Sequence, residues 1–274
     1  MNGICRAPVF SPEWTLDCTY PGRGEFMQSG FYVAFSGLAS KMQALDLAAS
    51  NLANSSTTGF KGQSPFYIRL TAAGAGSTRA PLNLAVNQFG LLGGARVDIR
   101  SGSLETTGNG TDLAVEGDGF FSVQTPGGIR YTRNGSFRLN PARQLVTQDG
   151  HPVLAAQGTR TMPITLPTGT ISVSPDGTVS VDGGIVAKLH VVQFAAGTNL
   201  LPEGNSNFIA PAGSETAAVG STVRQGMLEA SNVNSIEGAV GLMSLQRQAE
   251  MLGRALSIFN SVFDRAAVQE LPRL

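Results

Sequence analysis

The chain has 274 residues, of which 42% are hydrophobic and only 14% charged, with a formal net charge of +0. Nucleic-acid-binding proteins usually carry a basic patch, so this balance argues against a nucleic-acid partner. No run reaches the roughly 18 apolar residues of a membrane-spanning helix, so we expect no direct membrane insertion.

Residues 1–26 form an irregular extension that contains both cysteines, Cys5 and Cys18. Two thiols without a nearby histidine favour no metal site, although a disulfide between them is conceivable. Acidic residues interrupt the apolar run that a secretory signal needs, so we expect no cleaved signal peptide. Because helical periodicity begins just after Met27, we interpret that residue as the biological start; a real disordered extension is the alternative.

From Ser29 the sequence predicts a long helix with one apolar seam, because hydrophobic residues recur at the heptad spacing of a coiled coil. The seam dissolves into Ser55–Gly59, where hydroxylic side chains and glycine favour a helix end. We therefore expect an assembly helix and its terminating loop over 27–60 and a connector over 61–81. The seam positions are Phe31, Phe35, Leu38, Met42, Leu45, Ala49 and Leu52.

The middle of the chain, 82–223, predicts a central all-β domain, because short alternating strands are bounded by turn residues. The clearest signal is the hairpin Ile171–Val181, whose turn contains Pro175, Asp176 and Gly177. The stretch 195–220 is rich in Gly, Asn and Ala, and we expect loops there.

A second long helix is predicted within 224–274. Asn234 followed by Glu237 has the spacing of a capping box, and the helix then runs to about Ala267, a length of about 50 Å. Its seam could pair with the first seam, with neighbouring copies or with both, giving an α+β protein with a coiled-coil-like rod; a monomer whose helices clasp a core is the alternative. The seam contains Leu242, Leu245, Ala249, Leu252, Leu256, Phe259 and Phe263.

Three blocks, in order along the chain, resemble bacterial flagellar rod and hook proteins. The first resembles the start of these proteins, the second their central β region, and the third the motif that opens their C-terminal helix. Together the blocks cover the ends and the middle of the chain from roughly Ser29 to Ala267. The blocks are Asn51, Leu52, Ala53 and Asn54 with Gly59, Phe60 and Lys61; Glu116 to Val123 with Tyr131 to Phe137; and Gly226 to Glu229 with Ala230, Ser231, Asn232, Val233 and Asn234.

The resemblance implies a structural subunit of the flagellar basal-body rod that spans the periplasm. It implies assembly with copies of itself and with other rod proteins, and export through the flagellar type III apparatus. The proximal-rod members are favoured over the distal-rod or hook-type members. A secreted β-rich tube protein or adhesin would share the turns without needing both terminal blocks.

The sequence predicts no enzyme and no catalytic, cofactor-binding or metal-ligating residue. His151 and His190 have no recognisable nucleophile or cysteine nearby, which leaves a hydrolase as a distant alternative. Asn51 and Asn54 are either interface hydrogen-bonding residues or cap and turn residues. Arg247 and Glu250 form either an inter-subunit pair or a solvated helix face, and we interpret Gly117–Gly119 as a turn rather than a phosphate loop.

Overall fold

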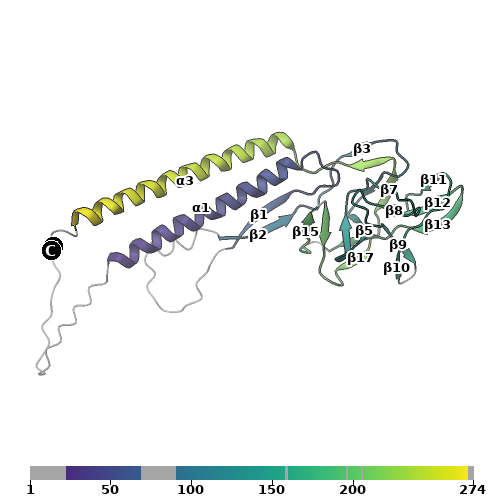
Figure 1. Cartoon of the computed structure of the whole chain (residues 1–274), viewed down its shortest axis with the longest axis horizontal. Coiled ribbons are helices and arrows are strands. Elements are labelled where there is room, and N and C mark those ends of the chain that lie inside the picture. Colours follow the sequence, from purple (N-terminus) through teal and green to yellow (C-terminus); the bar gives the residue numbers. More distant parts are fainter. Residues whose placement is uncertain (1–22, 69–90, 158–159, 196, 205, 271–274) are drawn as a thin grey trace, which may run out of the picture.

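The computed structural model describes residues 23–68, 91–157, 160–195, 197–204 and 206–270. Two long helices form an arm, and a β domain lies at one end of it (Figure 1). The helices are α1 (Arg23–Ala53) and α3 (Ser235–Glu270), of 31 and 36 residues. The predicted central β domain is confirmed. Helix α1 begins at Arg23 rather than Ser29, so the end of the predicted irregular extension is helical; both cysteines lie outside the described residues.

The helix ends next to the β domain are held by short polar side chains. Asn54 Nδ2 donates to the Ser50 carbonyl at 2.8 Å and Ser55 Oγ donates to the Leu52 carbonyl at 2.8 Å, which satisfies carbonyls in the last turn of α1. At the start of α3, Asn234 Oδ1 accepts the backbone N–H of Ile236 at 2.9 Å. The predicted Asn234 cap is therefore confirmed.

A two-stranded antiparallel ribbon lies along α1, formed by β1 (Gln63–Ile68) and β2 (Leu91–Val97). In Figure 1, α1 lies between α3 and this ribbon. The first strand falls inside the predicted connector 61–81, because the strand that pairs with it comes much later in the chain and leaves no local pattern. The remaining connector residues from 69 onward lie outside the described residues.

The β domain is built around a six-stranded antiparallel sheet in the order β15-β16-β6-β5-β14-β17. Smaller antiparallel sheets flank it: β3 with β19, β4 with β18, β7 with β8, β9 with β10, and β11-β12-β13. The strands are β3 (Leu104–Thr106), β4 (Leu113–Glu116), β5 (Gly119–Thr125), β6 (Gly128–Thr132), β7 (Arg138–Leu139), β8 (Leu145–Val146), β9 (Leu154–Gln157), β10 (Arg160–Pro163), β11 (Ile171–Val173), β12 (Thr178–Val181), β13 (Gly184–Lys188), β14 (Val191–Phe194), β15 (Leu201–Gly204), β16 (Asn207–Ile209), β17 (Glu215–Ala217), β18 (Thr222–Gln225) and β19 (Met227–Glu229).

The predicted hairpin over Ile171–Val181 is confirmed, since β11 and β12 pair with Ile171 opposite Val181. The expectation of loops over 195–220 is wrong, because β15, β16 and β17 all lie within it. These strands are short and lie at or near the sheet edges, and β16 pairs with the distant β6. Pairing with a remote strand compensates for a local composition that disfavours strands.

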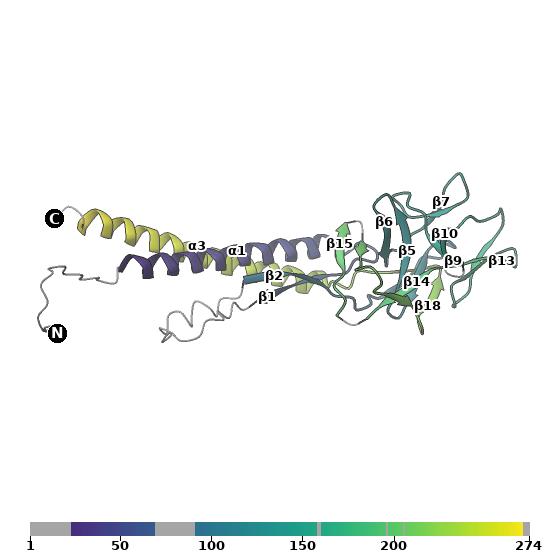
Figure 2. The same ribbon diagram turned by 90° about the horizontal axis from the view of Figure 1, so that it is seen from below.

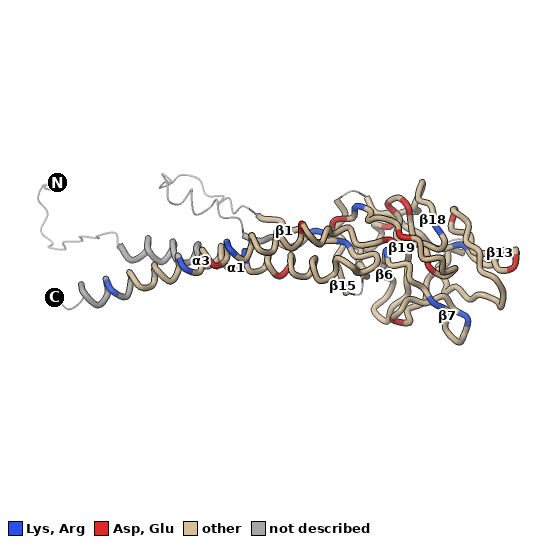
Figure 3. Tube along the Cα trace, turned by 90° about the horizontal axis from the view of Figure 1, so that it is seen from above, with Lys and Arg blue, Asp and Glu red and all other residues tan. Residues whose placement is uncertain are grey.

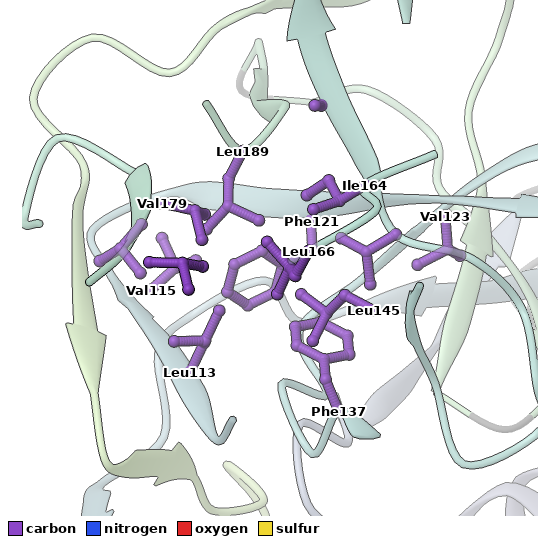
Figure 4. Packing of buried hydrophobic residues seen from close by; sticks show 14 residues of the cluster. Leu113, Val115, Phe121, Val123, Phe137, Leu145, Ile164, Leu166, Val179 and Leu189 are labelled. Atoms are coloured by element: carbon purple, nitrogen blue, oxygen red, sulfur yellow. The ribbon is translucent and has the colours of Figure 1, made fainter. Parts of the chain in front are cut away.

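Two hydrophobic clusters pack on opposite faces of the large sheet. Adjacent residues of a strand point to opposite faces, so Phe120 and Phe121 of β5 enter different clusters. Phe121 meets the edge of Phe137 at 5.2 Å between ring centroids, in the larger cluster (Figure 4). Phe120 meets Phe194 and Phe208 in the smaller one. The β domain therefore contains its own core.

The last two strands belong to the β domain although they precede α3 directly. β18 pairs with β4 and β19 pairs with β3, and β18 spans Thr222–Gln225. The predicted boundary between 82–223 and 224–274 therefore falls within β18.

We predict that a fragment of residues 82–231 is more stable than the fragment 82–223. The longer one keeps all of β18, the whole of β19 and the carboxylate of Glu229, which pairs with buried Arg133. Leaving a buried charge without its partner costs about 3 to 5 kcal/mol. Urea unfolding followed by circular dichroism measures the difference. Equal unfolding free energies would place the boundary at 223 after all.

Candidate functional site

The three sequence blocks meet at the junction between the helical arm and the β domain. The loop after α1 supplies Lys61, the end of β6 leads into Arg133, and β19 supplies Glu229. Lys61 Nζ lies 2.6 Å from Glu229 Oε1, and Arg133 Nη1 lies 3.1 Å from Glu229 Oε2. All three side chains are fully buried. We call these residues the junction triad.

Backbone groups complete the polar surroundings of the triad. Lys61 Nζ donates to the Arg100 carbonyl at 2.6 Å, and the Gly102 N–H donates to Glu229 Oε1 at 2.7 Å. Such hydrogen bonds offset part of the cost of removing the charges from water. Several remote segments of the chain are thereby tied to one carboxylate.

Arg133 is held by carbonyls and by an aromatic ring. Its Nη1 and Nη2 donate to the carbonyls of Val115 and Gly117 at 3.2 and 2.6 Å. The guanidinium carbon lies 4.7 Å from the centroid of the Phe120 ring, within cation–π range. Its Nε is buried without a hydrogen-bond partner. The ring of Phe120 thus links the junction triad to the smaller hydrophobic cluster.

The triad carries one more positive than negative charge, since two cations share one carboxylate. Burial lowers the pKa of Lys61 below its ordinary value of 10.5, and the Glu229 carboxylate opposes this shift. Burial likewise lowers the pKa of Arg133, again opposed by Glu229. Losing Glu229 would leave two buried cations together, whereas losing Lys61 would leave a neutral pair.

Gly59 lets the chain pass close enough for the triad to form. Its N–H donates to the Glu229 carbonyl at 2.7 Å, and its φ is 66°, in the left-handed region that favours glycine. A Cβ at this position would lie 2.3 Å from the backbone nitrogen of Asn134. Any other residue would push the loop after α1 away from the end of β6.

Two asparagines of the sequence blocks bind backbone on neighbouring segments. Asn51 Nδ2 donates to the Gln63 carbonyl at 2.7 Å, and Asn51 Oδ1 accepts the Gln63 N–H at 2.8 Å. These two hydrogen bonds hold β1 against α1. Asn232 Oδ1 accepts the Gly62 N–H at 2.8 Å, and its Nδ2 donates to the carbonyls of Asp98 and Arg100 at 2.9 and 3.1 Å. Both side chains act within the chain, where they join the ribbon to the two helices.

The other residues of the blocks lie around the same junction. Thr57 Oγ1 donates to Asn54 Oδ1 at 3.2 Å, and the Asn232 N–H donates to the Phe60 carbonyl at 3.4 Å. The Val233 N–H donates to Ser231 Oγ at 3.2 Å. Leu52 is half-buried, and Ala53 is exposed.

The two helices lie side by side (Figures 1 and 2). On α3, the residues of the predicted seam lie on the side toward α1. Leu256 is buried, and Leu242, Leu245 and Leu252 are half-buried. On α1, half-buried seam residues alternate with exposed ones. Leu38, Leu45 and Leu52 are half-buried, whereas Phe35 and Met42 are each 57% exposed; the side chains of Phe31, Phe259 and Phe263 lie outside the described set.

Helix α3 carries a second apolar stripe that the sequence reasoning missed. At 3.6 residues per turn, its members lie on the face opposite the seam, with Arg247 and Arg254 between them. We call this the outer stripe. A second set of hydrophobic residues in another helical phase is the signal that could have revealed it. Its apolar members are Ile236, Val240, Met243, Met251, Ile258 and Val262, which are 53 to 75% exposed.

The side chain of His190 makes a structural contact, and His151 donates its backbone N–H to Thr147 Oγ1 at 3.2 Å. His190 Nδ1 lies 2.9 Å from Ser122 Oγ, but Ser122 is fully buried on β5, so no substrate carbonyl can reach its hydroxyl. Burial lowers the pKa of His190, opposed by the charge of Glu215. His190 and Asp176 both line a pocket of about 280 Å³. Asp176 accepts hydrogen bonds from the N–H and the hydroxyl of Thr178.

Comparison with protein families matches three regions of the chain. Residues 31–61 match the family described as "Flagella basal body rod protein". Residues 114–181 match "Flagellar hook protein FlgE/F/G D1 domain", and residues 224–269 match "Flagellar basal body rod FlgEFG protein C-terminal". The matched regions contain most of α1, strands β5 to β12 of the β domain and nearly all of α3.

Comparison with curated proteins gives relatives that match over most of their length. The flagellar basal-body rod protein FlgF of Mesorhizobium japonicum is 32% identical over 228 residues, 82% of this chain and 90% of the relative. FlgF of Rhizobium meliloti is 34% identical over 81% of this chain and 89% of the relative. The flagellar basal-body rod protein FlgG of Borreliella burgdorferi is 30% identical over 84% of this chain and 94% of the relative.

We predict that Glu229→Gln destabilises the protein by about 3 to 5 kcal/mol, because it leaves two buried cations without an anion. Lys61→Met should cost less, since the pair of Glu229 and Arg133 remains and is neutral. Urea unfolding followed by circular dichroism gives both values. Equal decreases in the free energy of unfolding for the two variants would show that the net charge of the triad does not determine its stability.

We also predict a pH signature of Lys61. Because burial lowers its pKa in the folded state, the unfolded chain binds more protons between that value and 10.5. The contribution of Lys61 to the free energy of unfolding therefore rises with pH across this window. The difference in unfolding free energy between wild type and Lys61→Met should grow as pH approaches 10.5. A difference that is flat or shrinks with pH would contradict this assignment.

Proposed function

The chain belongs to the flagellar basal-body rod protein family and is a structural subunit of the rod, and on that premise we propose that it self-assembles through α1 and α3. The family is one of structural proteins, not of enzymes. None of the described helices is both long and apolar enough to cross a membrane. We propose that the seams of α1 and α3 pair in the manner of a coiled coil.

The outer stripe of α3 is the observation that carries the proposal. A helix that is apolar on opposite faces is normally covered on both, and α1 covers only one face of α3. Residues 238–246 and 255–263 of α3 contain no charged residue, and the described part of α3 is coloured accordingly in Figure 3. Other copies of the chain and other rod proteins are the partners that we propose for these surfaces.

We further propose a place in the proximal rod, with export by the flagellar type III apparatus. The family resemblance favours the proximal-rod members, which are those named FlgF, and relatives of that name match most of this chain. Relatives named FlgG, among them that of Bacillus subtilis at 32% identity, keep a distal position as the second candidate. Basal bodies purified from a strain that lacks this gene distinguish the two positions. A rod that stops before its proximal part is complete would indicate a proximal subunit, and a rod that lacks only its distal part would indicate a distal one.

We predict that Met251→Asp with Ile258→Asp abolishes assembly while the subunit stays folded. Both side chains are more than half exposed, so the change leaves the isolated chain intact. In an assembled rod each change would replace an apolar side chain by a carboxylate in the contact, and the neighbouring Arg254 offsets only part of the cost of removing that charge from water. Variants expressed in a deletion strain should fail to restore motility and should be missing from purified basal bodies.

Ser257→Asp is the matched control, because Ser257 is exposed on α3 but lies off the outer stripe. It should restore motility. Leu256→Asp is a poor test, since Leu256 is buried in the helix pair and its loss would disturb the subunit itself. Wild-type amounts of the Met251→Asp, Ile258→Asp variant in basal bodies would move the assembly role to the surface of the β domain.

A further inference from the structure

A groove lies between α1 and the ribbon. It is lined by Gln43, Asp46 and Leu47 of α1 and by Gly93, Gly94 and Ala95 of β2, with a volume of about 440 Å³. Gly93 is the extra residue of a bulge in the ribbon, because Phe66 pairs with Gly94 and Tyr67 with Leu92. The two glycines project no side chain of their own from β2, and the ring of Phe66 packs against Gly94, 3.1 Å from where a Cβ would lie. The β2 side of the groove is therefore lined by small residues.

From the arrangement of the arm, we propose that this groove receives the outer stripe of α3 from a second copy of the chain. The inference rests on the proposed self-assembly and names the two surfaces that meet. Both surfaces belong to the arm, and no described residue of the single subunit covers either of them. The long side chains of Met243 and Met251 suit a groove floored by small residues, because methionine adapts to irregular space.

Charge supports the pairing. Asp46 is exposed at the groove, and Arg247 and Arg254 lie between the apolar residues of the outer stripe. An acidic residue beside one apolar surface and basic residues within the other are complementary, which favours one docking orientation over others. Two copies of the outer stripe facing each other would instead bring arginines together.

The two surfaces lie on opposite sides of the arm, and this determines the kind of assembly. The outer stripe lies opposite the seam that faces α1, whereas the groove lies between α1 and the ribbon. The ribbon is on the far side of α1 from α3 (Figure 1). A contact between two different surfaces leaves one of each free at the ends of any pair. Repetition of such a heterologous contact gives a ring or an open helix, and a rod requires the open helix.

Cross-linking of single-cysteine variants tests the contact. In a background where Cys5 and Cys18 are replaced by Ser, Gln43→Cys and Met251→Cys are prepared separately with tags of different size and mixed under assembly conditions. A short bismaleimide should join Gln43→Cys to Met251→Cys and should give no Met251→Cys homodimer. The doubly substituted chain should give a ladder of oligomers. Ser257→Cys, which is exposed on α3 off the outer stripe, should not cross-link to Gln43→Cys.

A charge exchange gives an independent readout by sedimentation. Asp46→Arg should reduce the pelleted fraction, and Asp46→Arg combined with Arg247→Asp and Arg254→Asp should recover it. If wild type pellets but only Met251→Cys homodimers form, or no cross-link involves the groove, this inference is overturned while self-assembly stands. If wild type does not pellet with itself or with isolated basal bodies, self-assembly itself fails.

Discussion

The carboxylate of Glu229 lies between two buried cations that come from distant parts of the chain, and the joining of the arm to the β domain depends on it. Buried ion pairs add little net stability, but a structure that leaves one of the buried charges without its partner loses several kcal/mol. Glu229 sits opposite Leu104 in the pairing of β19 with β3. A slip of one residue would turn its side chain to the other face and leave Lys61 and Arg133 unpaired. The triad thus fixes the register of the strand that leads into α3.

Local signals in the sequence predicted the elements whose causes are local. The two long helices, the Asn234 cap and the turn around Gly177 all depend on residues within a few positions of each other. The ribbon and β16 were missed because they depend on remote partner strands, and β15 pairs only with β16. β17 was missed because its composition disfavours strands, although it pairs with β14. The triad was missed for the same reason: its members lie within the recognised blocks, yet Lys61 and Arg133 are 168 and 96 residues from Glu229. Sequence order cannot show that they meet.

The β domain and the arm differ in how completely they bury their apolar surface. Both clusters of the β domain close within one subunit, on the two faces of the large sheet. No described residue covers the outer stripe of α3 or the exposed Phe35 and Met42 of α1. The periodicity of the sequence identified only one of the two apolar faces of α3. The opposite stripe has the same repeat in another phase, so periodicity cannot show which face is covered. Only the position of α1 separates the covered face from the open one.

The placement of directional contacts follows from this difference. Apolar burial has no preferred direction, so the apolar faces of the arm do not by themselves fix how the arm is held. Hydrogen bonds and ion pairs are directional, and at the junction they come from Asn51, Asn232 and the triad. The junction can therefore set the orientation of the helices while their open faces stay free for partners. A subunit that must be presented to its neighbours in one orientation needs this division between a polar junction and an apolar arm.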